Sequence, residues 1–188
     1  MVITMGKKIV VLNGSPRANG NTAALIDAFT AGAIEAGNTL KRFDIQQMNI
    51  NPCLGCLKGG ADKKNPCTQN DAMGEIYPEY KDADILVLAS PLYYWSFSAQ
   101  LKMVVDRLFA VTEANAMKAP YKECIMLIAA AEDSPESFAP MVDYFRVLMK
   151  NLNWKDRGIV LAGDVYKIGD IAGKPSLDEA KQLGASIR

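Results

Sequence analysis

The chain has 188 residues, 49% of them apolar and 22% charged, and its 21 lysine and arginine residues balance 21 aspartate and glutamate residues. This length and balance predict one globular domain over residues 1–188 and argue against nucleic acid or an anionic membrane as a partner. The apolar runs are too short to span a membrane and no export signal is present, so we expect a cytoplasmic protein with four reduced cysteines.

Strand and helix patterns alternate along the chain without a linker. Continuous apolar runs predict buried parallel strands at residues 8–13 and 84–90, and further strands are predicted at 40–45, 123–130 and 158–162. Apolar residues at helical spacing predict helices at 22–36, 71–81, 99–111 and 137–152, and a Ser-x-x-Glu capping box at 176–179 predicts a last helix. The alternating pattern of the second strand favours a position near an edge. Such an order implies an open parallel α/β sheet covered by helices on both faces.

The loop between the first strand and the first helix has the composition of an anion site. Residues 14–22 read Gly-Ser-Pro-Arg-Ala-Asn-Gly-Asn-Thr. Glycines let the backbone turn tightly and approach a ligand, and a helix start leaves N–H groups and a positive dipole end facing the loop. Ser15, Asn21 and Thr22 add side-chain donors, and Arg17 adds positive charge. We therefore expect a bound phosphate here.

The spacing of this loop excludes several well-known phosphate loops. The interval between Gly14 and Gly20 is one residue too long for a nucleoside-triphosphate loop, and Asn21 stands where that loop has lysine. Pro16 replaces the second glycine of the dinucleotide pattern, and the loop has no cysteine to act as a phosphatase nucleophile. A cup for one terminal phosphate remains. The alternative is a polar turn in which Thr22 only caps the helix.

Three consecutive aromatic residues, Tyr93, Tyr94 and Trp95, follow the third strand. This loop shares an edge with the phosphate cup, because ligands of open parallel sheets bind beyond the carboxyl ends of the strands. Aromatic side chains in a loop have three explanations: a flat ligand lies against them, they form a subunit interface, or the loop packs onto a helix. A phosphate cup beside a flat platform favours a phosphorylated aromatic cofactor.

Several motifs occur together in the chain: Gly14-Ser-Pro-Arg17, Gly20-Asn-Thr22, Ala89-Ser-Pro-Leu-Tyr-Tyr94, Pro52-Cys-Leu-Gly-Cys56, Asn70-Asp71 and a closing segment from Gly163 to Leu183. With these motifs the chain resembles the NAD(P)H-dependent FMN reductase family of flavodoxin-like proteins. The resemblance covers nearly the whole chain. It implies a flavodoxin-like three-layer sandwich with a five-stranded parallel sheet in the order 2-1-3-4-5.

The resemblance also implies a cofactor and its contacts. FMN would be bound, with NAD(P)H as a transient electron donor, and the phosphate would be held by Ser15, Arg17, Asn21 and Thr22. The ribityl chain and the isoalloxazine would be lined by Pro91, Leu92, Tyr93, Tyr94 and Trp95, with Ala131 in the loop that approaches the ring. Family members usually form a homodimer or a dimer of dimers, with FMN near the subunit boundary.

The loop after the fourth strand departs from the family pattern. Family members usually carry small hydroxyl residues and glycines there, whereas this chain has Glu132 and Asp133. We expect these two carboxylates at the mouth of the site, facing solvent.

Three of the four cysteines fall in the long loop after the second strand. Cys53 and Cys56 are three residues apart, and Cys67 follows after ten intervening residues. This segment resembles the cluster-binding segment of iron–sulfur flavoproteins, which needs four thiolates, but it has three. Cys124 begins the fourth strand, at the opposite end of the sheet, and is expected in the core.

Other roles for the loop thiols are weaker. A zinc site would need a carboxylate such as Asp62 or Asp71 to complete it. A thioredoxin-like pair needs a helix start, which the neighbouring glycines disfavour. We expect no metal, and interpret these residues as thiols near the cofactor or a dimer boundary that react when exposed.

Histidine is absent, so catalysis depends on a cofactor, backbone dipoles or other side chains. We predict an FMN-binding oxidoreductase in which NAD(P)H delivers hydride to the flavin and a flavin, a quinone or another small acceptor then enters the same pocket. No side chain is predicted as a catalytic acid or base. The alternatives are a flavodoxin-type electron-transfer flavoprotein, an iron–sulfur flavoprotein and a non-flavin binding module.

Overall fold

The structure, a computed structural model, describes residues 6–60 and 62–188. Its sheet has five parallel strands in the order β2-β1-β3-β4-β5, which confirms the expected flavodoxin-like order. β2 lies at an edge, as its alternating pattern predicts. The strands are β1 (Lys8–Asn13), β2 (Thr39–Asp44), β3 (Ile85–Pro91), β4 (Glu123–Ala129) and β5 (Lys155–Ala162).

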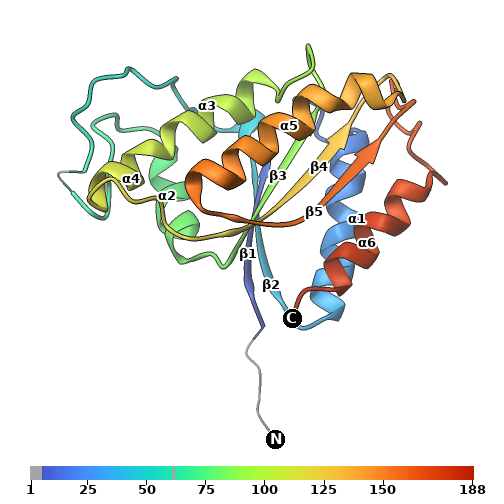
Figure 1. Ribbon diagram of the computed structural model, residues 1–188, viewed down its shortest axis with the longest axis horizontal. Helices are drawn as coiled ribbons and strands as arrows, with labels where there is room; N and C mark the ends of the chain where they lie inside the picture. The colour runs from blue at the N-terminus through green and yellow to red at the C-terminus, as the bar shows by residue number, and fades with distance from the viewer. Residues whose placement is uncertain (1–5, 61) are drawn as a thin grey trace, which may run out of the picture.

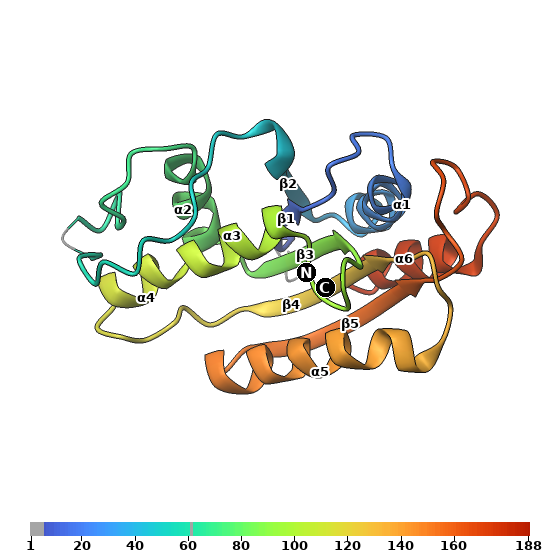
Figure 2. The same cartoon turned by 90° about the horizontal axis from the view of Figure 1, so that it is seen from above.

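Helices cover both faces of the sheet (Figures 1 and 2). The helices are α1 (Asn21–Glu35), α2 (Met73–Asp82), α3 (Ala99–Arg107), α4 (Phe109–Ala114), α5 (Pro135–Leu152) and α6 (Pro175–Ala185), and a short 3₁₀ helix, η1 (Ile45–Gln47), follows β2. α1 and α6 pack against each other on one face, and α2 to α5 cover the other. Ile9 and Val11 of β1 pack on the face covered by α1 and α6, because strand residues alternate between faces. Val10 and Leu12 pack on the face covered by α2 to α5.

Some element boundaries differ from the sequence expectation. The helix expected over 99–111 is two helices, α3 and α4, which meet at Leu108. The last strand starts at Lys155, three residues earlier than expected. α5 starts earlier too, because the hydroxyl of Ser134 accepts a 3.1 Å hydrogen bond from the Ser137 N–H and caps the helix.

The capping box expected for the last helix is wrong. Lys174 occupies the N-cap position of α6 and makes no side-chain capping bond. Pro175 takes the first helical position, where its fixed φ and missing N–H are well suited. The Ser176 hydroxyl is buried inside the helix, with no hydrogen-bond partner among the described residues.

All five strands point the same way, so the loops that follow them gather at one edge of the sheet, at the top of Figure 1. The strand order reverses between β1 and β3, which is where open α/β sheets bind ligands. None of the helices in the described part of the chain combines the length and the apolar character of a membrane span.

Candidate functional site

A cavity of about 220 Å³ opens at this edge, between the β1–α1, β3–α3 and β5–α6 connections. We call it the edge cavity. It brings together most of the residues that the sequence predicts for the site: Ser15, Arg17, Asn21, Thr22, Pro91, Leu92, Tyr93 and Ala131. Tyr94 and Trp95 lie outside its lining. Val165 and Tyr166, which the sequence does not single out, complete the wall.

The start of α1 faces the edge cavity without a side-chain cap. Gly20 occupies the N-cap position and makes no side-chain capping bond. The first N–H groups of a helix have no acceptor within the helix, so those of Asn21 and Thr22 are left for a ligand, and the helix dipole makes this point positive. The alternative in which Thr22 caps the helix is wrong, because Thr22 lies within the first turn and is 2% exposed.

Close contacts explain the glycines of this loop. A Cβ on Gly14 would lie 2.5 Å from the Leu101 Cβ and 2.7 Å from the Ser98 Oγ. The Ser98 hydroxyl donates a 2.7 Å hydrogen bond to the Gly14 carbonyl oxygen. A Cβ on Gly20 would lie 3.0 Å from the Arg17 Cβ. The β1–α1 loop and the start of α3 are therefore packed as one unit.

Two residues predicted to hold a phosphate also bind the segment after β5. The side-chain amide of Asn21 donates to the carbonyl oxygens of Val165, at 3.2 Å, and Lys167, at 2.9 Å. Nη1 of Arg17 donates to the Tyr166 carbonyl oxygen at 2.8 Å. The Asn21 carboxamide is therefore engaged within the protein. What Asn21 can offer a ligand is its backbone N–H. The exposed Arg17 guanidinium retains further N–H donors.

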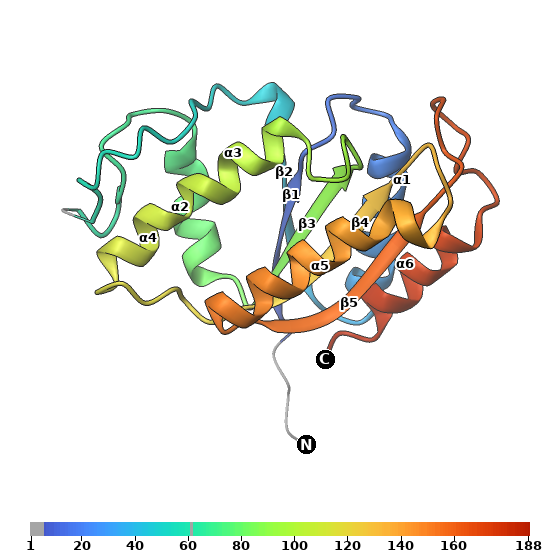
Figure 3. The same ribbon diagram turned by 45° about the horizontal axis from the view of Figure 1, so that its top comes forward.

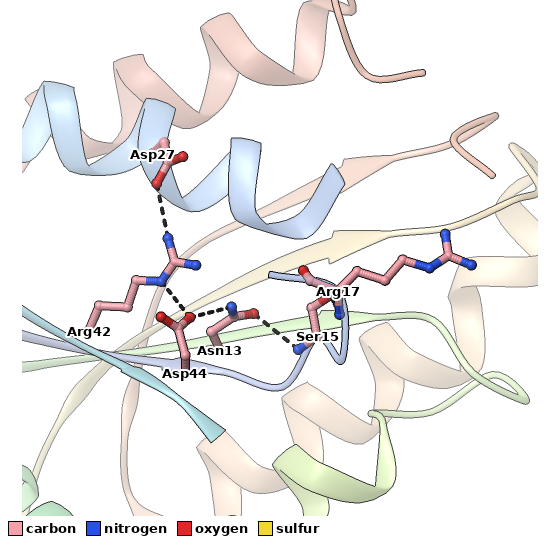
Figure 4. Close-up of polar contacts among 6 residues, drawn as sticks. All are labelled: Asn13, Ser15, Arg17, Asp27, Arg42 and Asp44. Carbon is pink, nitrogen blue, oxygen red and sulfur yellow. Dashed lines mark hydrogen bonds and ion pairs between the residues drawn. The ribbon is translucent and has the colours of Figure 1, made fainter. Parts of the chain in front are cut away.

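A series of hydrogen-bonded polar side chains supports the β1–α1 loop from below (Figure 4). Asn13, 1% exposed at the end of β1, accepts a 3.0 Å hydrogen bond from the Ser15 N–H and donates a 2.7 Å bond to Asp44. Arg42 donates to Asp44 at 2.7 Å and to Asp27 of α1 at 3.0 Å. Asn13 was not among the residues predicted from the sequence, although an amide directly before a ligand loop is a signal that could have pointed to it.

The aromatic segment forms a tight, strained turn. Tyr93 and Ser96 exchange two backbone hydrogen bonds of 3.0 Å, and Tyr94 and Trp95 between them have φ of 47° and 59°. Two left-handed residues are the pattern of a type I′ turn, in which Asn-Gly is preferred and other residues cost about 1–2 kcal/mol each. Tyr94 is 94% exposed, so packing of the loop onto a helix does not explain its side chain.

The loop after β4 contributes backbone and one small side chain. Ala131 lines the edge cavity, whereas Glu132 and Asp133 are exposed and do not line it, as expected. The Ser137 hydroxyl donates to the Glu132 carboxylate, and the Asp133 side chain packs where a Cβ on Gly163 would be. Both carboxylates are thus held outside the cavity.

The loop cysteines lie apart from the edge cavity. Cys53 and Cys56 are exposed, Cys67 is half-buried, and Cys124 is in the core as expected. The Lys58 backbone N–H and the Thr68 hydroxyl hold the pKa of the Cys56 thiol below its usual range. Burial raises the pKa of Cys124, which therefore remains a protonated core thiol.

The Asp71 carboxylate is unavailable as a zinc ligand because it pairs with Arg107. The two side chains are 2% and 1% exposed, and Arg107 donates to the two carboxylate oxygens at 2.8 and 3.1 Å. Burial favours the neutral acid, but the hydrogen bonds from Arg107 and from the N–H groups of Asn51 and Met73 outweigh it and lower the pKa of Asp71. Within residues 6–60 and 62–188, no three cysteine or carboxylate side chains are arranged to hold a metal ion.

Comparison with known proteins shows the family to which the chain belongs. Residues 7–158 match the family described as NADPH-dependent FMN reductase. The chain belongs to this family. An iron–sulfur flavoprotein from Archaeoglobus fulgidus is 33% identical over 183 residues, which cover 96% of this chain and 78% of that protein. The resemblance in the motifs is confirmed, and with it an NAD(P)H-dependent oxidoreductase with FMN as its cofactor.

Solved structures of other oxidoreductases share the fold. An NAD(P)H:quinone oxidoreductase from Methanothermobacter marburgensis superposes with a TM-score of 0.73 at 19% identity, covering 96% of this chain and 98% of that one. An FMN-dependent NADH-azoreductase from Bacillus anthracis, in complex with FMN, gives 0.70 at 14% identity, with 95% and 98% covered.

Proposed function

We propose that this chain reduces a small acceptor such as a flavin or a quinone with electrons from NAD(P)H, and that FMN binds in the edge cavity and against the aromatic turn beside it. One observation supports this placement of FMN. The uncapped start of α1, the Arg17 side chain and the loop that leads into Tyr94 and Trp95 all meet at this one cavity. A terminal phosphate and a flat ring need these two kinds of surface.

The phosphate end is assigned to the first loop. The backbone N–H groups of Asn21 and Thr22 donate to it along the helix axis, and the Thr22 hydroxyl adds a donor. The Ser15 hydroxyl, which donates a 3.3 Å hydrogen bond to the Arg17 carbonyl oxygen in this structure, would turn to the phosphate instead. Arg17 balances the phosphate charge through charge-assisted hydrogen bonds. Asn13 keeps the Ser15 N–H engaged and so holds the loop in place.

The ring end is assigned to the third-strand loop. Pro91 and Leu92 line the path between the cup and the turn, and Leu92 is anchored by a 2.8 Å hydrogen bond from its N–H to the Ala129 carbonyl oxygen. The rings of Tyr93, Tyr94 and Trp95 provide the aromatic surface, and Ala131 leaves room for the ring on the other side.

FMN bound here would supply the redox chemistry, which is acceptance of hydride from NAD(P)H and transfer of the electrons to the second substrate. The chain binds and orients the reactants. Among the described residues, the lining of the edge cavity includes no carboxylate, lysine or cysteine. We therefore assign no side chain as a catalytic acid or base.

The absorbance spectrum of the purified protein tests this proposal. Titration with FMN should give two protein-bound flavin bands at one FMN per chain, and anaerobic NADPH should bleach both. Absence of FMN uptake would reject the proposal in favour of a non-flavin binding module. Bleaching by dithionite but not by NADPH or NADH would favour an electron-transfer flavoprotein.

The relative from Archaeoglobus fulgidus favours a second candidate, an iron–sulfur flavoprotein. In that case electrons from FMN would leave through a cluster bound by the loop cysteines. A broad absorbance beneath the flavin bands, with iron and acid-labile sulfide by analysis, is the expected signature.

We also propose that two copies of the chain associate. α5 lies apart from α3 and α4 (Figure 2), and an apolar groove of about 670 Å³ between them leaves Phe109 and Met117 41% and 65% exposed. A second copy covering this groove would bury them. Light scattering should give a dimer mass, and Phe109→Glu should give a monomer.

The four free thiols favour a reducing, cytoplasmic location for the protein.

A further inference from the structure

The three loop cysteines share one small space, separate from the edge cavity. Cys53, Cys56 and Cys67 line a cavity of about 90 Å³, which Arg107 of α3 and Glu113 of α4 close from the other side. We call it the thiol cavity. The segment between β2 and α2 lies beside α4 (Figure 3), and the side-chain amide of Gln69 donates a 3.0 Å hydrogen bond to the Pro52 carbonyl oxygen. This bond brings the two ends of the cysteine segment together.

The spacing of these cysteines is that of a cluster segment with one position changed. Compact cluster segments supply four thiolates, commonly with the first three at intervals of three residues. Cys53 and Cys56 keep this interval, but the next position is Gly59, and Cys67 follows eight residues later. The remaining cysteine, Cys124, is fully buried in β4 and does not line the cavity. The missing thiolate is therefore the one that position 59 would carry.

A carboxylate occupies the place of the missing side chain. A Cβ built on Gly59 would collide with Oε2 of Glu113 and would lie 3.3 Å from the Pro66 carbonyl oxygen. The Gly59 backbone is not in the left-handed region, so it would accept a side chain if the carboxylate moved. Carboxylate oxygens suit hard cations, whereas iron–sulfur clusters are held by soft thiolates.

The rest of the thiol cavity still suits an anionic group. Nε of the buried Arg107 has no hydrogen-bond partner in the described part of the chain. Its other guanidinium nitrogens are held by Asp71 and by the Asn51 carbonyl oxygen, at 2.7 to 3.1 Å. The Nε–H is one unused hydrogen-bond donor beside the three thiols, while the positive charge of the guanidinium is already balanced by Asp71. The thiol cavity thus offers a cluster one spare N–H donor but lacks the fourth thiolate.

We infer that this chain has exchanged the fourth thiolate of a cluster site for Glu113 and binds no iron–sulfur cluster, so that FMN is its only redox group. The inference rests on the proposed function for FMN itself. It also narrows that function, because electrons then leave the protein from FMN directly to a small acceptor. The three cysteines remain as free thiols around a cavity that the Glu113 side chain enters.

Restoring the thiolate tests the inference. The Gly59→Cys/Glu113→Ala variant adds the fourth ligand and removes the carboxylate that blocks it. The matched control is Gly74→Cys/Glu113→Ala, because Gly74 is exposed on α2 and a Cβ there meets nothing within 4 Å. Each FMN-loaded protein is incubated anaerobically with ferrous iron and sulfide, desalted, and assayed for iron, acid-labile sulfide and the electron paramagnetic resonance signal after dithionite reduction.

The natural chain and the control should retain no more iron than a cysteine-free protein treated in the same way. The Gly59→Cys/Glu113→Ala variant should retain about four iron atoms per chain with a reduced-cluster signal. Iron, sulfide and that signal in the natural chain would overturn the inference. A folded variant without iron would also overturn it, and Gly59→Cys alone serves if the double variant fails to fold. FMN content, measured separately, reports on the proposed function and not on the cluster.

Discussion

The side-chain amide of Asn21, in the first turn of α1, donates a 2.9 Å hydrogen bond to the backbone carbonyl oxygen of Lys167, in the segment between β5 and α6. The side-chain carbonyl oxygen of Asn21 accepts a further hydrogen bond from the Gly169 N–H at 3.2 Å. One residue in the lining of the edge cavity therefore fixes a connection that lies nearly 150 positions away in the chain. The wall formed by Val165 and Tyr166 depends on this connection.

Replacement of this amide should loosen the far wall of the edge cavity. Asn21→Ala removes bonds worth about 0.5–1.5 kcal/mol each, so the Kd for FMN should rise about tenfold. Hydrogen exchange of the backbone at 165–169 should become faster. Asn19→Ala, at an exposed position in the same loop, is the control, and equal effects of the two changes would contradict the role given to Asn21.

The assignment of the phosphate cup predicts a change that depends on the phosphate. Arg17→Ala combined with Thr22→Ala removes charge-assisted bonds of about 1.5–3 kcal/mol each, so FMN affinity should fall at least tenfold. Riboflavin, which lacks the phosphate, should bind the variant and the natural protein alike. Thr30→Ala, farther along the same helix, should change neither affinity. Equal losses for FMN and riboflavin would place the phosphate elsewhere.

The strained turn predicts a trade between stability and cofactor binding. Tyr94→Asn with Trp95→Gly introduces the pair that a type I′ turn prefers, and relief of the left-handed strain should raise the free energy of unfolding by about 1–2 kcal/mol. The same variant loses the exposed aromatic surface and should bind FMN more weakly. Thermal unfolding of the FMN-free protein and FMN titration measure the two effects. Unchanged FMN affinity would show that the two rings do not contact the cofactor.

The buried pair of Asp71 and Arg107 predicts a large loss of stability. Arg107→Leu leaves the Asp71 carboxylate buried without its partner, which costs about 3–5 kcal/mol. Arg146→Leu is the matched control, because it breaks an exposed ion pair with Asp143 and should cost less than about 1 kcal/mol. Urea unfolding at neutral pH compares the two. Similar losses of stability in the two variants would mean that the buried pair contributes little to the stability of the fold.

The same ion pair predicts that the free energy of unfolding depends on pH in the acid range. The pKa of Asp71 is lower in the folded chain than in the unfolded chain, so its contribution to stability is complete above about pH 4 and is lost as the pH falls through the lower folded value. The free energy of unfolding should therefore fall less steeply between neutral pH and pH 3 in Asp71→Asn than in the natural protein. Parallel pH profiles would contradict this linkage.

The sequence predicted the fold, and it predicted that most of the proposed site residues lie at one edge of the sheet, because both depend on local patterns. Buried parallel strands are continuous apolar runs, and β1 matches its expected bounds of 8–13. The strands of a parallel sheet end at one edge, so loops rich in glycine, hydroxyl and aromatic residues meet there. The β1–α1 loop and the start of the aromatic loop do meet, at the edge cavity.

Several decisive features had no local signal. The break between α3 and α4 at Leu108 interrupts a continuous apolar stripe, and the left-handed Tyr94 and Trp95 contradict the usual preference of aromatic residues. Val165 and Tyr166 reach the edge cavity only because the chain returns from β5 across the start of α1.

By itself, the sequence determined the strand order, through its family motifs, and the count of three loop thiols, and it predicted that the first loop holds a phosphate. Only the tertiary structure decided that the Asn21 side chain is committed to the β5–α6 segment and that Glu113 stands where a fourth thiol would be. The physical reason is the same in both cases. A side chain's partner is set by which distant segment packs beside it, and that depends on how the helices and connections cross the sheet.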